Sequence, residues 1–337
     1  MCFSSEPAKI LLGLLEVLFI IESNRGAVFC VLLFSFYKNG LQEVLRQTDQ
    51  LLLYFRRDRV YIQKLKWFLT GLFLCVLVSL AVGDAHIIVT WNYVYSAKGL
   101  LLQPWCNCTY SVKDQVPLFF FFSMLPEILA RSVLVLVCGC GVVLLGSLTV
   151  IKRAFASAYD VHDLTAVQTQ YCVVANVIDN INVKLGGLLA FSLMADFIPV
   201  CGRVSRLLFL SADPFQINDT LAAVKHVYLI LLVAGCYIAG MYFPFSRLHK
   251  QVLELQRQIL ARKRLVLTLN TKELHQSAPE LDKLYALLQE QPLVLTPAQG
   301  FPIHSNFNLV ILTVLSSYTF LLWQTMKESL TGGRNGG

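Results

Sequence analysis

Residues 306–326 read NFNLVILTVLSSYTFLLWQTM and form one long apolar segment near the end of the chain. At about 1.5 Å per residue, a helix of this length crosses a hydrocarbon layer of roughly 30 Å. The segment carries a stripe of mainly polar residues on one helical face. The residues of this stripe are Thr313, Ser317, Leu321, Gln324 and Glu328. Because unsatisfied polar groups cost several kcal/mol in lipid, the stripe must face protein or water.

Two interpretations of the stripe stay open. In the first, the Ser and Thr hydroxyls bond to their own helix and Gln324 joins neighbouring helices. In the second, copies of the helix surround an axis and line a pore. Gln324 then narrows the path, and Leu321, one turn inward, acts as an apolar gate.

Ser317 and Tyr318 are followed by five mainly apolar residues and then by Gln324. This spacing resembles the C-terminal signature of the arthropod gustatory receptor family, which has Thr-Tyr, five apolar positions and Gln-Phe. Here Ser replaces Thr, and Thr325 stands where Phe is usual. Upstream, the stretch GFPI at 300–303 is similar to the family's sequence leading into its last helix.

The composition indicates a polytopic membrane protein, located in the plasma membrane if the resemblance holds. Of 337 residues, 56% are hydrophobic and 15% charged, and the mean hydropathy is +0.60. Soluble domains carry about 25% charged residues. The net charge of +7 does not indicate nucleic-acid binding, because the basic residues cluster beside apolar segments and point to a lipid bilayer. We find no Cys-x2-Cys pairs, His-Glu-x-x-His or Gly-x-Ser-x-Gly, so we expect no metal, no cofactor and no enzyme activity.

The apolar segments predict an all-α membrane protein with seven transmembrane helices, the first short or truncated. The expected segments are 9–21, 27–53, 67–95, 117–151, 171–200, 221–245 and 306–326, with an external turn at 22–26. Positive charge accumulates after the second, fourth and sixth, which predicts the N-terminus inside and the C-terminus outside. The glycosylation sequons at Asn107 and Asn218, each expected in a loop, both fall outside on this topology.

The resulting organisation has four parts. Residues 1–245 hold transmembrane helices one to six with the ligand-binding region in their outer half, 246–305 form a cytoplasmic helical anchor, 306–328 form the pore-lining last helix, and 329–337 form an extracellular tail. A cytoplasmic hairpin is expected at 38–66. Within the anchor, helices starting near Gln251 and Glu280 are joined by a turn at Ser277, Ala278 and Pro279.

The gustatory resemblance implies a cation channel of four subunits, either a homotetramer or a heterotetramer with other gustatory receptor subunits. Its partners would be permeating cations and a small-molecule tastant. Carried onto this sequence, Gln324 would lie at the narrow part, Leu321 at the gate and Ser317 near the inner vestibule. Glu328 would lie near the external mouth, where four carboxylates would raise the local cation concentration. The alternative for Glu328 is a solvated C-terminal charge.

The resemblance also implies a ligand pocket within each subunit, in the outer half between helices two to six. The candidate residues are Asp84, His86, Trp91, Asn92, Tyr95, Phe120, Glu127, Arg131, Lys225, His226 and Tyr228. Glu127 and Arg131 are four residues apart in the order that favours a local ion pair. The aromatic candidates are equally typical of an interfacial belt.

The sequence agrees less well with two other classes of membrane protein. A G-protein-coupled receptor requires the opposite orientation, and the sequence has no Asp-Arg-Tyr after the third segment and no Asn-Pro-x-x-Tyr in the seventh. A secondary transporter would have related halves with broken helices at matching positions, which the sequence does not show.

Overall fold

The computed structural model describes residues 25–55, 63, 66–74, 125–158, 160–210, 217–269, 272–300 and 302–304. It also describes 306–307, 309–311, 313–314, 316–318, 320–321 and 324. Within these ranges, the side chains of 54–55, 198–237, 239, 267, 269 and 272–276 are outside the description.

Every regular element among the described residues is a helix, which confirms the all-helical prediction for that part of the chain. The elements are η1 (a π-helix, Leu33–Tyr37), α2 (Lys38–Phe55), α5 (Leu125–Ser157), α6 (Val161–Leu210), α7 (Ile217–Leu269), α8 (Lys272–Glu290) and η3 (a 3-10 turn, Pro297–Gln299). Three described stretches are long and apolar enough to cross a membrane: Arg25–Leu53, Leu125–Ser157 and Val161–Phe197. The count of seven spans and the orientation stay predictions.

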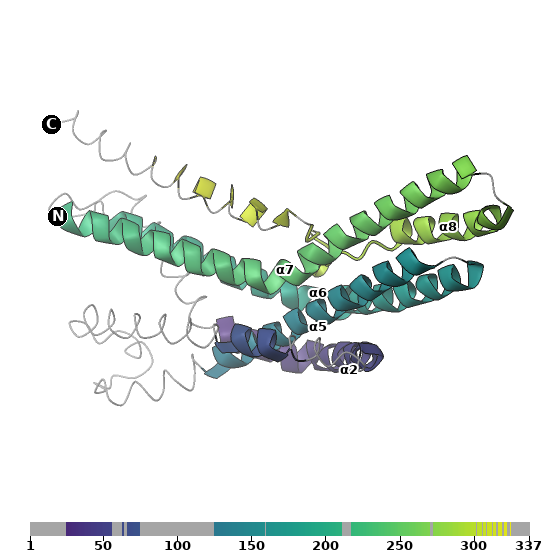
Figure 1. Ribbon diagram of the computed structural model, residues 1–337. Helices are drawn as coiled ribbons and strands as arrows, with labels where there is room; N and C mark the ends of the chain where they lie inside the picture. The colour runs from purple at the N-terminus through teal and green to yellow at the C-terminus, as the bar shows by residue number, and fades with distance from the viewer. Residues whose placement is uncertain are drawn as a thin grey trace.

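The long helices α5, α6 and α7 pack against one another, and their shared apolar core positions the rest (Figure 1). Helix α2 packs on α5 and α6, while α8 runs back beside the second half of α7 and also contacts α6. Helix α7 changes direction partway along its length (Figure 1) and contains Pro244. Proline lacks an N–H and clashes with the preceding turn, which accounts for a bend there.

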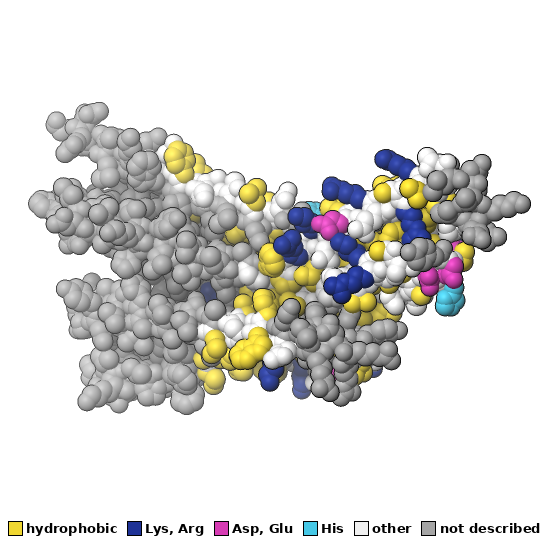
Figure 2. All heavy atoms as spheres, viewed as in Figure 1, with side chains coloured by type: hydrophobic (Ala, Val, Ile, Leu, Met, Phe, Trp, Pro, Cys, Tyr) yellow, Lys and Arg dark blue, Asp and Glu magenta, His cyan; other side chains and the backbone are white. Residues whose placement is uncertain are grey.

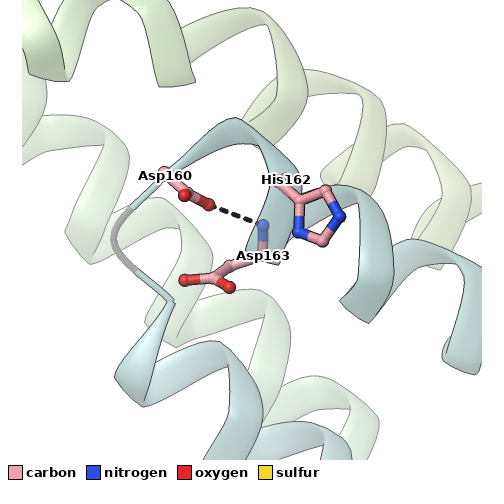
Figure 3. Close-up of side chains that lie close together, drawn as sticks. All are labelled: Asp160, His162 and Asp163. Atoms are coloured by element: carbon pink, nitrogen blue, oxygen red, sulfur yellow. Dashed lines mark hydrogen bonds between the residues drawn. The ribbon is translucent and has the colours of Figure 1, made fainter.

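The junction between α5 and α6 is formed by a capping motif (Figure 3). The Asp163 backbone N–H donates to Asp160 Oδ1 at 2.7 Å. This bond satisfies one of the free donors at the start of α6, and the two carboxylates favour the positive end of the helix. His162 also lies within reach of both carboxylates, but all three side chains are exposed. The capping of α6 therefore accounts for why Asp160, His162 and Asp163 lie close together.

The helices differ from the expected segments in three places. The break between the anchor helices comes between α7 and α8, not at Ser277, Ala278 and Pro279, which lie inside α8. Arg25 and Gly26, expected in an external turn, lie in a helix. Asn218 lies in the first turn of α7 rather than in a loop. The expected turns and loop followed from polar or proline-containing stretches of sequence. A helix continues through such a stretch when its apolar face stays packed against the rest of the protein.

Basic side chains gather over the second half of α7 (Figure 2). Arg247, Lys250, Arg257 and Arg264 are all exposed there. One acidic neighbour, Glu254, is bound across the helix pair by Lys152 of α5 at 2.7 Å. The Lys152 hydrogen bond is the main reason that the pKa of Glu254 lies below its usual range. On the predicted topology, which stays a prediction, this surface faces the cytoplasm.

Candidate functional site: a buried charge cluster and the terminal helix

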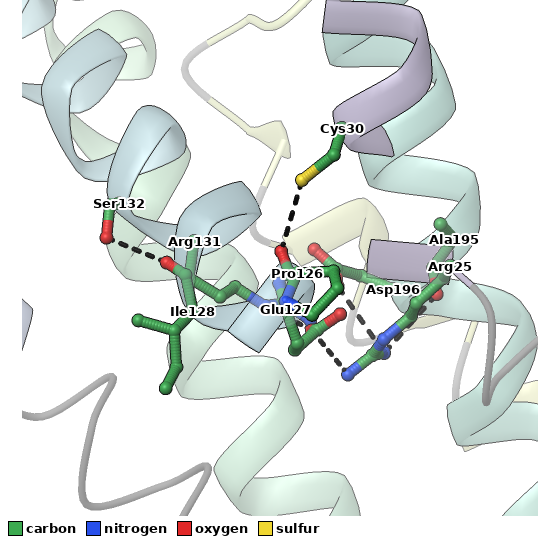
Figure 4. Close-up of polar contacts among 9 residues, drawn as sticks. All are labelled: Arg25, Cys30, Pro126, Glu127, Ile128, Arg131, Ser132, Ala195 and Asp196. Atoms are coloured by element: carbon green, nitrogen blue, oxygen red, sulfur yellow. Dashed lines mark hydrogen bonds and ion pairs between the residues drawn. The ribbon is translucent and has the colours of Figure 1, made fainter. Parts of the chain in front are cut away.

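Four charged side chains from three helical segments meet inside the helix bundle (Figure 4). We call them the charge cluster: Arg25, Glu127, Arg131 and Asp196. Arg25 lies in the first described helix, Glu127 and Arg131 lie one turn apart in α5, and Asp196 lies in α6. Each of these side chains is between 9% and 17% exposed.

The two arginines alternate with the two carboxylates. Glu127 Oε1 accepts from Arg25 Nη2 at 2.8 Å and from Arg131 Nε at 2.8 Å. Arg131 Nη2 lies 2.5 Å from Asp196 Oδ1, and Arg25 Nη1 lies 3.8 Å from the same oxygen. The cluster therefore has no formal net charge, the condition under which charged groups persist at membrane depth.

The helices approach closely at this point because Gly26 faces the backbone of α5. A Cβ at Gly26 would lie 2.6 Å from the backbone nitrogen of Glu127. Glycine therefore sets the helix separation that lets Arg25 reach Glu127.

Gly26→Ala is expected to lower the free energy of unfolding by about 1–3 kcal/mol, because backbone atoms cannot turn aside as a side chain does. Thermal unfolding of the purified chain in detergent measures the change. Gly71→Ala is the matched control, since no atom of the described residues lies within 4 Å of a Cβ there. An equal loss in both variants would contradict the close approach.

Two small pockets adjoin the charge cluster and share Leu134 and Asp196. The first, with a cavity volume of about 10 Å³, is lined mainly by apolar residues of α5, α6 and α7 and includes Tyr242. The second, also about 10 Å³, is lined by the charge cluster and by Phe29 and Phe191, among others. Each cavity is about the size of one water molecule, far smaller than a typical ligand pocket. In this conformation they are narrow.

The structure brings two of the predicted ligand-binding residues together. Glu127 and Arg131 form the ion pair that their spacing predicts; a ligand role for them stays a prediction. Sequence reasoning missed Arg25 and Asp196 as their partners. Asp196 had a usable signal, since it is an acidic residue in an apolar run, where charges are rare and paired.

The other ligand-binding candidates, the two sequon asparagines and Glu328 fall where no side chain is described. Asp84, His86, Trp91, Asn92, Tyr95, Phe120, Asn107 and Glu328 lie outside the described residues, and Lys225, His226, Tyr228 and Asn218 lie in α7 within the stretch whose side chains are not described. Their roles stay predictions.

The described residues of the polar stripe on the terminal helix are exposed. The described residues between 307 and 324 are all helical, and they run back toward the same end of the molecule as the first half of α7 (Figure 1). Thr313, Ser317 and Gln324 are exposed, and Leu321 is 60% exposed. The Thr313 hydroxyl donates to the Leu309 carbonyl at 2.8 Å. This bond within the helix is the kind that the first interpretation of the polar stripe expects. Near its start this helix packs on the core, where the Phe307 ring meets Tyr242 edge-on at 5.6 Å.

Residues 291–304, which we call the strap, join α8 to the terminal helix and are bound to α6. Asn182 of α6 donates from Nδ2 to the Val294 carbonyl at 2.9 Å and accepts at Oδ1 from the Thr296 N–H at 2.8 Å. The Tyr171 hydroxyl donates to the Gln291 carbonyl at 2.7 Å. These bonds tie the start of the terminal helix to α6.

The strap is also held by packing. Leu293, Leu295 and Ile303 are fully buried, and the Ile303 N–H donates to the Leu295 carbonyl at 2.8 Å. Gly186 of α6 lets η3 approach, because a Cβ there would lie 3.1 Å from the Ala298 backbone nitrogen. A displacement of α6 would therefore move the strap.

No protein-family model matches the sequence, and no curated protein matches it significantly. Solved structures of the olfactory receptor OR5 from the insect Machilis hrabei do resemble the chain in fold. One has a TM-score of 0.55 at 14% identity, covering 96% of this chain and 90% of that one. A second, in complex with eugenol, has a TM-score of 0.51 at 14% identity, covering 96% and 91%. Both neighbours are receptors rather than enzymes, and at this identity the likeness concerns the fold: the chain has the helical membrane-protein fold of an insect olfactory receptor.

Proposed function

We propose that this chain is a chemosensory receptor of the gustatory type and forms a ligand-gated, non-selective cation channel at the plasma membrane. Four such chains, alone or with related subunits, would surround the pore. The olfactory receptor fold and the residue pattern at Ser317, Tyr318 and Gln324 support this proposal.

The exposure of the polar stripe on the terminal helix carries the proposal. Thr313, Ser317 and Gln324 are exposed on a helix face that also exposes Leu309, Val310 and Phe320. Apolar residues can face lipid, whereas the Gln324 amide requires water or protein. Symmetry-related copies of the helix around a water-filled axis would supply that water or protein.

Gating would run from the outer half of the bundle to the terminal helix through α6. A small-molecule tastant that binds one conformation more tightly shifts the population toward it. Because the strap is hydrogen-bonded to α6, an altered α6 position would turn the terminal helix. Leu321 would then leave the axis, and Gln324 would become the polar lining.

Leu321→Ala is expected to raise the current recorded without ligand, because a smaller apolar ring wets more readily. Substitutions at Gln324 are expected to change the relative permeability to different cations. Currents from cells that express the chain measure both effects. Ser316→Ala is the control, since Ser316 is exposed and lies five residues, or about 140° of helical rotation, from Leu321. Unchanged currents in the Leu321 and Gln324 variants, at normal surface expression, would remove the pore assignment.

The orientation distinguishes this channel from a G-protein-coupled receptor. A tag at the C-terminus is expected to bind antibody on intact cells, because the proposed topology ends outside. A tag that becomes accessible only after permeabilisation would contradict that topology. Recording against sugars, bitter compounds and amines would then identify the tastant class.

A further inference from the structure

Two histidines from different elements meet where the strap leads into the terminal helix. His249 lies in the second half of α7, and His304 lies at the end of the strap. Their ring centroids are 4.9 Å apart and the ring planes are inclined by 51°. The His304 carbonyl also accepts from the Phe307 N–H at 3.0 Å, so His304 is directly joined to the first turn of the terminal helix.

The His249 ring has a buried polar atom whose bonding is not satisfied. Its Nδ1 atom is buried and makes no hydrogen bond in the described part of the structure. A buried polar atom without a partner calls for an explanation.

We propose that His249 and His304 together bind a divalent transition-metal ion of the Zn²⁺ and Cu²⁺ class. An ion about 2.0–2.1 Å from one nitrogen of each ring lies about 3.2 Å from each ring centroid. Centroids separated by 4.9 Å then subtend an angle of about 100° at the ion, near the tetrahedral angle that zinc prefers. Imidazole is a preferred ligand for both ions.

The described surroundings of the pair are mainly basic. His249 is flanked on α7 by the exposed cations Arg247 and Lys250, and the Arg247 guanidinium lies 5.4 Å from the Phe243 ring centroid. The carboxylate of Glu254, farther along α7, is bound by Lys152. Nearby positive charge lowers the affinity for a divalent cation. The bound ion would join α7 to the end of the strap.

The test uses the purified full-length chain in detergent, with Zn²⁺ and Cu²⁺ as probes, and does not depend on ion conduction. Bound Cu²⁺ is expected to give an electron paramagnetic resonance spectrum with two coordinated imidazole nitrogens. His304→Ala and His249→Gln are each expected to lower Zn²⁺ affinity by about 100-fold or more. Removing a metal ligand weakens binding at least as much as removing a residue that hydrogen-bonds to a ligand. Since His304 is exposed, His304→Ala keeps the test valid even where His249→Gln fails to fold.

His162→Ala is the matched control, because His162 lies beside two carboxylates at the start of α6. Wild-type affinity in this variant is expected. Loss of Zn²⁺ binding in His162→Ala, or its retention in His304→Ala, would overturn the proposal. As an independent measurement, Zn²⁺ is expected to slow amide hydrogen exchange in residues 292–304 of the wild type but not of His304→Ala.

Discussion

Arg131→Met is expected to lower the free energy of unfolding by about 3–5 kcal/mol, the cost of removing one partner from a buried ion pair. Methionine fills similar space but leaves Glu127 and Asp196 with only Arg25 to neutralise them. In the structure Arg131 contacts both carboxylates, at 2.8 Å and 2.5 Å. Thermal or denaturant unfolding of the purified chain measures the loss.

Arg46→Met is the matched control for this variant. Arg46 also pairs with a carboxylate of its own helix, Glu43 at 2.8 Å, but its side chain is 65% exposed. An exposed ion pair contributes little to stability, so only a small loss is expected. The double variant Arg131→Met with Glu127→Gln removes one charge of each sign, so it is expected to be more stable than Arg131→Met alone. If Arg131→Met proved as stable as Arg46→Met, water rather than Arg131 would be compensating the two carboxylates of the charge cluster.

Asn182→Leu is expected to free the strap from α6. The substitution leaves the Val294 carbonyl and the Thr296 N–H without their side-chain partner, at about 1–3 kcal/mol for each group that stays buried. Faster amide hydrogen exchange at Thr296 and its neighbours measures the release. If α6 transmits gating, the same variant weakens the dependence of current on ligand.

Asn180→Leu separates this effect from a general loss of α6 packing. Asn180 is in the same helix but donates to Gln47 Oε1 at 3.0 Å and so binds toward α2. Its loss is expected to leave exchange in the strap unchanged. Equal acceleration in both variants would mean that Asn182 does not hold the strap specifically.

The helical class and the Glu127–Arg131 pair were predictable because both depend on neighbours within a few turns. Apolar runs and four-residue spacing are local properties of a helix. The helix limits were less predictable. Pro279 marked a turn from its sequence, yet it lies inside α8, whose residues Leu281, Leu284 and Leu288 are fully buried.

The sequence by itself determined a helical membrane protein and a terminal helix with one polar stripe, because hydropathy and the 3.6-residue period act on adjacent residues. Tertiary structure alone decided that Arg25 and Asp196 complete the charge cluster and that His249 meets His304. It also decided that Asn182 holds the strap. These partners lie far apart along the chain, so they meet only through the packing of α5, α6 and α7, and no local pattern encodes that packing.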